Sequence, residues 1–531
     1  MPTHSIPYKN TGYFSKLICD YLDENKSLKP FYNRFPSLEN FKGQIEEKQR
    51  DFTSDKRTLL SKRIMFQYSD NFLSQATLSN IDLLKEHTTF TITTGHQLNL
   101  FTGPLYFLYK IFSVINLCEE LKKEYPNNHF VPIYWMATED HDFEEINYFE
   151  LFGKKVEWNR SASGAVGELS TEGLAEVKNQ LKNKFGKSDN GKKLISLFSK
   201  AYTKHQNLAD ATRYLANEIF NNYGLIIVDG NDVELKKCFI PYAKKELTEN
   251  LSYREVTATT KKLVDLGFSE QVHPREINLF YLNKNLRERI IERDGTYYIN
   301  ETDITLTREE ILKELDEHPE RFSPNALLRP LYEEVILPNL CYIGGGGELA
   351  YWFQLKDYFN KVEVPFPILL LRNSALLISK IALEKLEKLN IKVDDLFLPQ
   401  HELTTKHTNE ISKFAINFSK QRNYLQKQFK ELYKIAEKTD KSFLGAVSAQ
   451  EKKQLNGLDN LEKRLLKAQK RKYSDELDRV KHIQDKLFPN QSLQERRLNF
   501  SEFYLEYGED LLDILKDGLD PLDMQFVVFE L

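Results

Sequence analysis

The sequence predicts an α/β chain in which a doubly wound parallel sheet is followed by a C-terminal antiparallel α-helical coiled coil. Two observations lead to this fold class: segments of strand and helix character alternate through the first 400 residues, and apolar residues recur every seven positions after residue 403. Alternation is typical of parallel sheets joined by crossover helices, and a heptad repeat is typical of paired long helices. We therefore expect a core over residues 1–400, a helical arm over residues 401–490, and a C-terminal segment over residues 491–531 that docks on the core.

The clearest strand–helix–strand unit lies between Phe90 and Asn147. An apolar, β-branched run begins at Phe90, and a second apolar run covers residues 130–136. Between them, Thr102 can cap the first turn of a helix, and Pro104 lies where a missing N–H costs nothing. In such a unit both strands deliver their carboxyl ends to one edge of a parallel sheet, which is where open α/β sheets bind ligands.

Further segments extend the predicted sheet along the chain. Residues 206–222 have helical character and precede a short apolar run at residues 224–229, which ends in an aspartate. A second apolar run, residues 340–343, leads through four glycines into a helical segment, residues 348–359, and a third run covers residues 367–371. Four or five such units support a doubly wound sheet.

Two stretches interrupt this alternation and are interpreted as insertions into the core. The first, near residues 150–200, contains paired short strands and a polar loop. The second, near residues 265–325, contains three runs at residues 277–281, 287–292 and 296–299, which are typical of an antiparallel meander. We expect these insertions to form a lid over the ligand-binding edge of the sheet.

The region after residue 403 has the pattern of an antiparallel pair of long helices. At about 1.5 Å per residue, an arm of about 35 residues would reach roughly 50 Å, so it either packs on its own core or pairs with a second subunit. The heptad positions are Ile411, Phe418, Leu425 and Leu432 and, after a break at residues 442–449, Leu466, Tyr473, Val480 and Leu487.

Composition favours a globular protein whose partners are small molecules or proteins. The 531 residues include 41% hydrophobic and 29% charged side chains, and the formal net charge of −4 argues against a nucleic-acid binder that works by bulk electrostatics. No apolar run is long enough to span a bilayer, and the first residues lack the apolar stretch of a signal peptide. The four scattered cysteines form no CxxC pair, which suggests a reducing compartment. We therefore expect a cytoplasmic protein with no nucleic-acid or membrane partner.

The residues that can carry chemistry gather at predicted strand ends. Glu139, Asp140, His141 and Asp142 place three carboxylates and an imidazole in four residues, which could bind a divalent metal, orient an amine or act as a general base. An acidic helix N-terminus is the competing interpretation. His96 follows the first strand and precedes a helix, so its imidazole could donate to a phosphate or to developing charge, or could simply hydrogen-bond the turn.

A run of four glycines, Gly344–Gly347, follows another predicted strand end. Backbone this permissive, directly before a helix, could cradle a phosphate through its amides. The run does not match G-x-G-x-x-G, because the sixth position is Leu349, and a flexible turn is the alternative.

Four long motifs, in this order along the chain, resemble one family. They are TGHQLNLFTGPLYFLYK, VPIYWMATEDHDFEEIN, FSPNALLRPLYEEVILPNLCYIGGGGELAYW and LFPNQSLQERRLNF. Together they resemble the cysteine-adding enzymes of bacillithiol biosynthesis, and the likeness runs through nearly the whole chain. The resemblance implies a Rossmann-like core with an inserted connecting domain and a coiled-coil arm that mediates homodimerisation.

The resemblance also implies a ligase reaction. In this family, the carboxylate of L-cysteine is joined to the amine of glucosaminyl malate. Because amide formation needs an activated acyl group, we expect an adenine nucleotide, ATP or ADP, as cosubstrate, with Mg²⁺ as a candidate companion ion. Two alternatives come from other classes: a metal-dependent hydrolase that uses the Glu139–Asp142 cluster as ligands, and a non-catalytic coiled-coil assembly protein.

The resemblance and the strand ends together assign the site residues. We expect catalysis by Asp140, His141 and Asp142 beside glucosaminyl malate, with His96 in support, and we assign no metal ligand. We expect the nucleotide to lie over the turn after the first strand and over the glycine run. The nucleotide-binding residues are then Thr94, Gly95, His96, Gln97, Gly344, Gly345, Gly346, Gly347 and Glu348.

Overall fold

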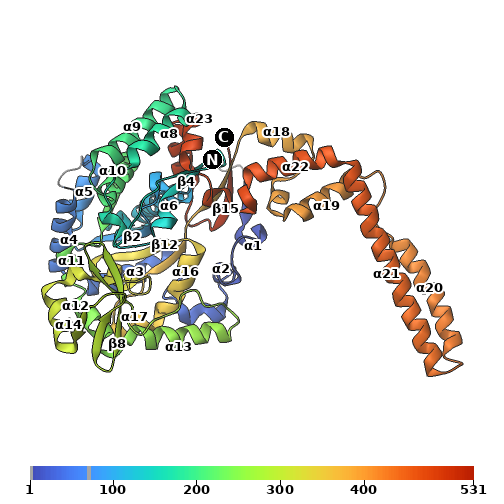
Figure 1. The fold of residues 1–531 in the computed structure, drawn as a ribbon, viewed down its shortest axis with the longest axis horizontal. Coiled ribbons are helices and arrows are strands. Elements are labelled where there is room, and N and C mark those ends of the chain that lie inside the picture. Colours follow the sequence, from blue (N-terminus) through green and yellow to red (C-terminus); the bar gives the residue numbers. More distant parts are fainter. Residues whose placement is uncertain (1–3, 69–72) are drawn as a thin grey trace. The chain divides into compact units, whose positions relative to one another are not determined.

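The computed structural model describes residues 4–68 and 73–531 and divides into two compact units. The first unit contains Met1–Leu376 and Gln494–Phe529, and the second contains Leu377–Leu493 and Glu530–Leu531 (Figure 1). The chain therefore leaves the first unit and returns to it, so that the C-terminal segment belongs to the same compact unit as the N-terminal region.

A five-stranded parallel sheet lies at the centre of the first unit. Its strands are β2 (Thr89–His96), β3 (His129–Met136), β6 (Ile226–Asp229), β12 (Asn339–Gly344) and β13 (Ile368–Leu371). They lie in the order β13-β12-β2-β3-β6, and every neighbouring pair is parallel. The strand order reverses between β2 and β12, which confirms the predicted doubly wound sheet and places a topological switch point there.

Helix α6 (Tyr106–Glu124) connects β2 to β3, but the predicted cap at Thr102 is wrong. The helix begins after Leu105 without a side-chain cap, and Thr102 lies in a preceding turn with a φ of 69°. In that turn the ring of Phe101 is fully buried, and its backbone N–H donates to the Tyr202 hydroxyl at 2.8 Å. Burial of Phe101 therefore decides the local backbone and overrides the capping propensity of Thr102.

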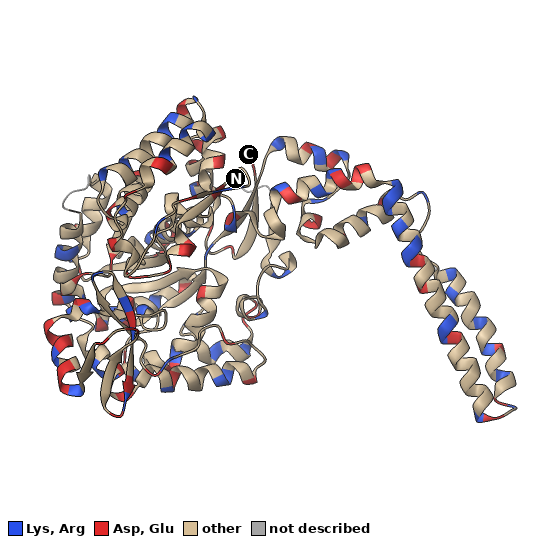
Figure 2. Ribbon diagram, in the orientation of Figure 1, with Lys and Arg blue, Asp and Glu red and all other residues tan. Residues whose placement is uncertain are grey.

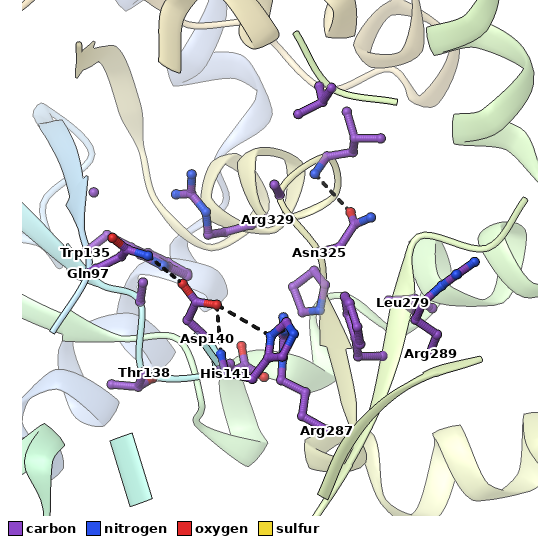
Figure 3. Close-up of a pocket in the computed structure, with 18 of the residues that line it drawn as sticks. Gln97, Trp135, Thr138, Asp140, His141, Leu279, Arg287, Arg289, Asn325 and Arg329 are labelled. Carbon is purple, nitrogen blue, oxygen red and sulfur yellow. Dashed lines mark hydrogen bonds and ion pairs between the residues drawn. The ribbon is translucent and has the colours of Figure 1, made fainter. Parts of the chain in front are cut away.

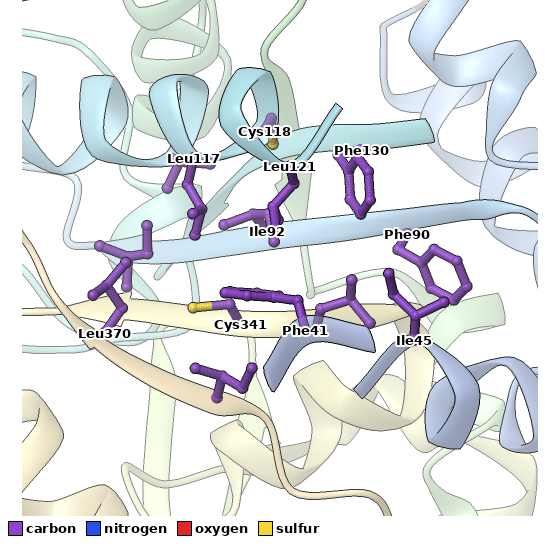
Figure 4. Close-up of a cluster of buried hydrophobic side chains, with 14 residues drawn as sticks. Phe41, Ile45, Phe90, Ile92, Leu117, Cys118, Leu121, Phe130, Cys341 and Leu370 are labelled. Atoms are coloured by element: carbon purple, nitrogen blue, oxygen red, sulfur yellow. The ribbon is translucent and has the colours of Figure 1, made fainter. Parts of the chain in front are cut away.

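Apolar side chains cover both faces of the sheet. Figure 4 shows α6 on one face and α3 (Leu38–Asp51) on the other. Because these strands are buried on both faces, β3 and β13 are nearly unbroken apolar runs, whereas β2 also carries four buried threonines. The cluster includes Phe41, Ile45, Phe90, Ile92, Leu117, Cys118, Leu121, Phe130, Cys341 and Leu370.

The second insertion is a five-stranded antiparallel sheet. Its strands are β7 (Leu279–Asn283), β8 (Leu286–Arg293), β9 (Thr296–Ile299), β10 (Thr305–Thr307) and β11 (Phe322–Pro324), in the order β10-β9-β8-β7-β11. The turn between β8 and β9 has positive φ at both Asp294 and Gly295, as a tight hairpin turn requires. The structure thus confirms the predicted meander.

The first insertion is smaller and mostly helical. A hairpin of β4 (Tyr148–Leu151) and β5 (Lys154–Glu157) precedes two packed helices, α8 (Leu174–Phe185) and α9 (Asp189–Lys204). Its paired short strands agree with the sequence pattern.

Most of the remaining elements belong to the first unit, while β14 crosses the boundary after Leu376, and strand β1 pairs antiparallel with β15. Over the described residues, no helix is long and apolar enough to cross a membrane. These elements are β1 (His4–Pro7), α1 (Tyr8–Thr11), α2 (Lys16–Leu22), α4 (Ser54–Gln67), α5 (Gln75–Leu83), α7 (Phe143–Ile146), α10 (Leu208–Phe220), α11 (Val233–Lys237), α12 (Ile240–Glu249), α13 (Leu251–Asp265), α14 (Arg308–Glu317), α15 (Arg329–Ile336), α16 (Gly346–Trp352), α17 (Lys356–Val362), β14 (Ser374–Ile378), α23 (Phe500–Tyr507), α24 (Asp510–Gly518) and β15 (Gln525–Glu530).

The second unit is helical and contains the predicted antiparallel helix pair. Its helices are α18 (Lys380–Lys388), α19 (Gln400–Ile411), α20 (Ser419–Ala436), α21 (Lys441–Lys472) and α22 (Ser474–Leu487). Helices α20 and α21 form a hairpin, and both basic and acidic residues are present along it (Figure 2). At about 1.5 Å per residue, the length of α21 corresponds to roughly 48 Å.

The predicted break at residues 442–449 is wrong, because these residues are helical. The turn lies earlier, and the Asp440 side chain caps α21 by accepting from the Phe443 N–H at 2.8 Å. Both predicted heptad runs are also divided. Ile411 ends α19 and Phe418 precedes α20, and α21 ends before Tyr473 with α22 following it.

Candidate active site

A cavity of about 530 Å³ opens at the carboxyl ends of β2 and β3. One wall is formed by the residues that follow these two strands, and the opposite wall comes from the antiparallel sheet of the second insertion (Figure 3). The second insertion therefore lies over the ligand-binding edge, as expected of a lid. The charged and polar lining residues include Gln97, Glu139, Asp140, His141, Arg275, Arg287, Arg289, Asn325, Arg329 and Glu348.

Asp140 lies just after the carboxyl end of β3 and is held as an ionised carboxylate. The Gln97 amide donates to Oδ2 at 3.0 Å, and the backbone N–H of His141 donates to Oδ1 at 2.8 Å. Burial alone would raise the pKa of Asp140, but its contact with the His141 side chain, the two hydrogen bonds above and the nearby Arg287 charge hold that pKa well below its ordinary value. A carboxylate of this kind is a weak base and a good partner for a cation.

His141 lies beside Asp140 and contacts the second insertion. Its Nδ1 atom is 2.6 Å from Nη1 of Arg287 on β8 and 3.6 Å from Oδ1 of Asp140. The imidazole is half exposed and packs against the Phe280 ring on β7, with ring centroids 5.5 Å apart. The residues that orient His141 thus come from strands about 140 positions further along the chain.

Glu139 and Asp142, the other two acids of the cluster, bind groups outside the Asp140–His141 pair. Glu139 forms an ion pair with the buried Lys236 at 2.5 Å, and Lys236 also donates to the Glu320 carbonyl. Asp142 is the N-cap of α7 and accepts from the Glu145 N–H at 3.3 Å. The structure therefore brings Asp140 and His141 into the cavity, whereas Asp142 lies outside its lining and caps a helix.

This arrangement does not support the metal-dependent hydrolase. Glu139 is bound to Lys236 and Asp142 turns to its own helix, so the four neighbouring side chains do not converge on one point. Across residues 4–68 and 73–531, no three His, Cys, Asp or Glu side chains form a group that could hold a metal ion.

His96 is a buried, neutral imidazole at the inner end of the cavity. It is 6% exposed, packs between Tyr106 and Phe107, and has no described hydrogen-bond partner at Nε2. Burial lowers the pKa of His96 well below its ordinary value, and the charges of Lys110 and Arg372 act in the same direction. His96 can therefore contact a bound molecule without carrying charge.

The glycine run after β12 is closed by its own helix. Glu348 accepts from the Gly345 N–H at 2.6 Å and from the buried Lys110 ammonium at 2.7 Å. Lys110 also donates to the Gly95 carbonyl at 2.7 Å, so it joins the two strand ends on either side of the switch point. Thr94 has a structural contact as well, because its hydroxyl donates to the Ile343 carbonyl on β12.

Arg329 is a cavity residue that sequence reasoning missed. Its guanidinium donates to the Tyr351 hydroxyl at 2.6 Å and lies 3.5 Å from Glu333. Gly95 packs against it so closely that a Cβ there would lie 3.1 Å from Nη1. Arg329 belongs to the quoted third motif, and a lysine in the apolar stretch of α6 could have drawn attention to Lys110.

Comparison with known proteins identifies the family. Residues 1–373 match the model "Bacillithiol biosynthesis BshC, N-terminal Rossmann-like domain", and residues 375–531 match "Bacillithiol biosynthesis BshC, C-terminal coiled-coil domain". The chain belongs to the BshC family of bacillithiol biosynthesis. The resemblance found in the four motifs is thereby confirmed, as is the combination of a Rossmann-like core with a coiled coil.

Relatives in this family span the whole chain. A protein of Christiangramia forsetii named "Putative cysteine ligase BshC" is 57% identical, with 99% of each chain covered. The protein of the same name from Flavobacterium psychrophilum is 56% identical, with 100% of each covered. A Bacillus cereus protein of this name is 26% identical and covers 97% of this chain and 98% of its own length.

Proposed function

We propose that the chain joins the carboxylate of L-cysteine to the amine of glucosaminyl malate. The observation that supports this proposal is the distribution of charge in the cavity. The ionised Asp140 lies on one wall, and arginines from the second insertion lie on the other. Glucosaminyl malate carries an amine that can be protonated and two carboxylates, so it matches a cavity with both signs of charge. The names of the relatives support the same reaction.

Asp140 would bind and orient the amine. Because its pKa is held well below the ordinary range, Asp140 is a poor acceptor of a proton at neutral pH and a good partner for an ammonium group. The amine would lose its proton to solvent at the open side of the cavity before it attacks the activated carboxyl carbon.

The malyl carboxylates would bind the opposite wall. Arg287 and Arg289 lie on the same face of β8, two positions apart, and both line the cavity. Since Arg287 already contacts His141, Arg289 and the exposed Arg275 are the arginines of the second insertion left for the substrate. Guanidinium groups bind carboxylates with two parallel hydrogen bonds, which suits a dicarboxylate.

The residues at the switch point fit an anionic cosubstrate such as an adenine nucleotide, ATP or ADP with Mg²⁺. Lys110 is a buried cation there, Arg329 is a half-buried one, and a Cβ at Gly347 would meet open space. The Gly345 amide is already bound by Glu348, so a phosphate would approach Gly346 and Gly347. The nucleotide would supply the activation of the cysteine carboxylate.

The direct test is a ligation assay. Purified protein is incubated with cysteine, glucosaminyl malate and ATP, and the thiol product is measured by mass spectrometry, with one component omitted in each control. Product that depends on all three components supports the proposal. If no product forms while the protein is folded and binds its substrates, the proposal fails.

A second copy of the chain would cover the α20–α21 hairpin. Tyr424 is 67% exposed and Leu461 is 52% exposed, and both line a groove of about 560 Å³ on the hairpin. Large apolar side chains left exposed side by side are typical of an interface between subunits. A purely assembling role would leave the polar cavity of the first unit unexplained.

Self-association can be tested on these two residues. The double variant Tyr424→Gln and Leu461→Gln should be monomeric by light scattering, with its helical content unchanged. The exposed Lys427→Gln is the matched control and should leave the mass of the assembly unchanged. A monomeric wild type would contradict the proposal.

A further inference from the structure

The contact between Arg287 and His141 determines which imidazole nitrogen carries the proton. A guanidinium offers only N–H donors and no lone pair. Its Nη1 atom lies 2.6 Å from Nδ1 of His141, a hydrogen-bond distance (Figure 3). Nδ1 must therefore accept, which places the ring hydrogen on Nε2.

The competing assignment places a proton on Nδ1 that points to Asp140. The distance from Nδ1 to Oδ1 of Asp140 is 3.6 Å, which is too long for a hydrogen bond. That oxygen already accepts from the backbone N–H of His141 at 2.8 Å. An N–H at Nδ1 would also face an N–H of Arg287, and two donors repel at this distance.

Two strands of the second insertion fix the Arg287 guanidinium. Its carbon atom lies over the Phe280 ring on β7, 4.0 Å from the centroid, and its Nε atom donates to the Ser323 hydroxyl on β11 at 3.3 Å. Only 9% of Arg287 is exposed. The guanidinium is therefore oriented toward His141 before any ligand binds.

We propose that Arg287 is a positioning residue that fixes His141 as a hydrogen-bond donor through Nε2. No described residue hydrogen-bonds this nitrogen, and the ring lines the cavity. When the amine attacks the acyl carbon, the carbonyl π pair moves to oxygen, and the Nε2–H donates to that developing oxyanion. His141 transfers no proton in this step; the amine loses its proton to solvent. The chemical role rests on the proposed function, whereas the tautomer does not.

The tautomer can be observed directly. Protein labelled with nitrogen-15 histidine is studied by NMR at neutral pH, and the His141 signals are assigned by their loss in His141→Gln. We expect a protonated Nε2 and an unprotonated Nδ1 in the wild type and in Arg287→Lys, which keeps a cationic donor. Arg287→Met removes the donor and should yield a mixture of tautomers. The exposed Arg293→Met, at the end of the same strand, is the matched control and should match the wild type.

Kinetics test the role of this donor. Arg287→Met should lower kcat by about 100-fold with little change in KM, because an oxyanion donor acts in the transition state. Arg287→Lys should recover most of that loss, and Arg287→Met combined with His141→Ala should be no slower than His141→Ala alone.

The NMR spectra test the tautomer of His141, and the ligation assay tests its chemical role. A proton on Nδ1 in the wild type overturns it, as does an unchanged tautomer in Arg287→Met. If Arg287→Met does not fold, the wild-type spectrum and Arg287→Lys still test it. If the wild type shows the expected tautomer but forms no amide, the proposed function fails and the tautomer stands.

Discussion

Two loops at the same edge of the sheet, after β3 and after β12, are held in different ways. The loop after β3 depends on distant residues, since Gln97 and Arg287 orient Asp140 and His141. The loop after β12 is closed locally, because Glu348 accepts a hydrogen bond from the Gly345 N–H, three residues before it. Polar side chains at a strand end are thus held in place for binding when residues from another part of the chain orient them. A glycine run whose amide is bound by a nearby side chain is mainly a structural turn.

The largest expected change in activity distinguishes two neighbouring acids in the loop after β3, Asp140 and Asp142. Asp140→Asn should lower kcat/KM for ligation by about 100-fold or more, because it removes the charge that binds the amine. Asp142→Asn should leave the rate unchanged, since asparagine caps a helix as well as aspartate does. Steady-state assays of both variants measure this, and equal losses would show that the two acids act together.

The buried Glu333 on α15 should make the free energy of unfolding depend on pH. Burial raises the pKa of Glu333 to about 8, with the Arg329 charge acting in the opposite direction. The folded state then holds a proton that the unfolded state has released, so stability falls as pH rises between about 4.5 and about 8. Glu333→Gln should remove this fall, on the order of 5 kcal/mol across the window.

Denaturant unfolding across this pH range measures that effect as a difference between the two proteins. The difference in unfolding free energy should grow with pH in favour of Glu333→Gln. A constant difference would show that Glu333 is ionised throughout and that Arg329 compensates it fully.

The smallest expected effects compare two glycines in the β12 loop. A Cβ at Gly344 would lie 2.9 Å from the Tyr342 ring, so Gly344→Ala should cost about 1–3 kcal/mol of stability. A Cβ at Gly347 meets nothing within 4 Å, so Gly347→Ala should keep full stability. If a nucleotide lies on this loop, Gly347→Ala should weaken its binding several-fold in a calorimetric titration. Unchanged binding would place the nucleotide elsewhere.

The sequence predicted the sheet well because burial on both faces leaves a direct pattern. The apolar runs that became β2, β3 and β12 needed no knowledge of distant contacts. The cap at Thr102 failed for the opposite reason: burial of Phe101, a tertiary effect, decided that turn. The break after α20 was misplaced because one capping residue, Asp440, ended the turn early.

The site was predicted only in part. Asp140 and His141 stand out locally as polar residues at a strand end, and both line the cavity. Arg287 could not be found, because one arginine in an amphipathic strand carries no signal and its partner lies 146 positions away. The role of Asp142 was also hidden, since a helix cap and a catalytic acid look alike in sequence.

A comparison of two ligands tests most directly whether Asp140 is the partner of the substrate amine. Calorimetry would measure the binding of glucosaminyl malate and of its N-acetyl derivative, which cannot carry the charge, to the wild type and to Asp140→Asn. We expect the wild type to prefer the free amine by about tenfold or more and Asp140→Asn to lose this preference. An equal preference in both proteins would contradict it.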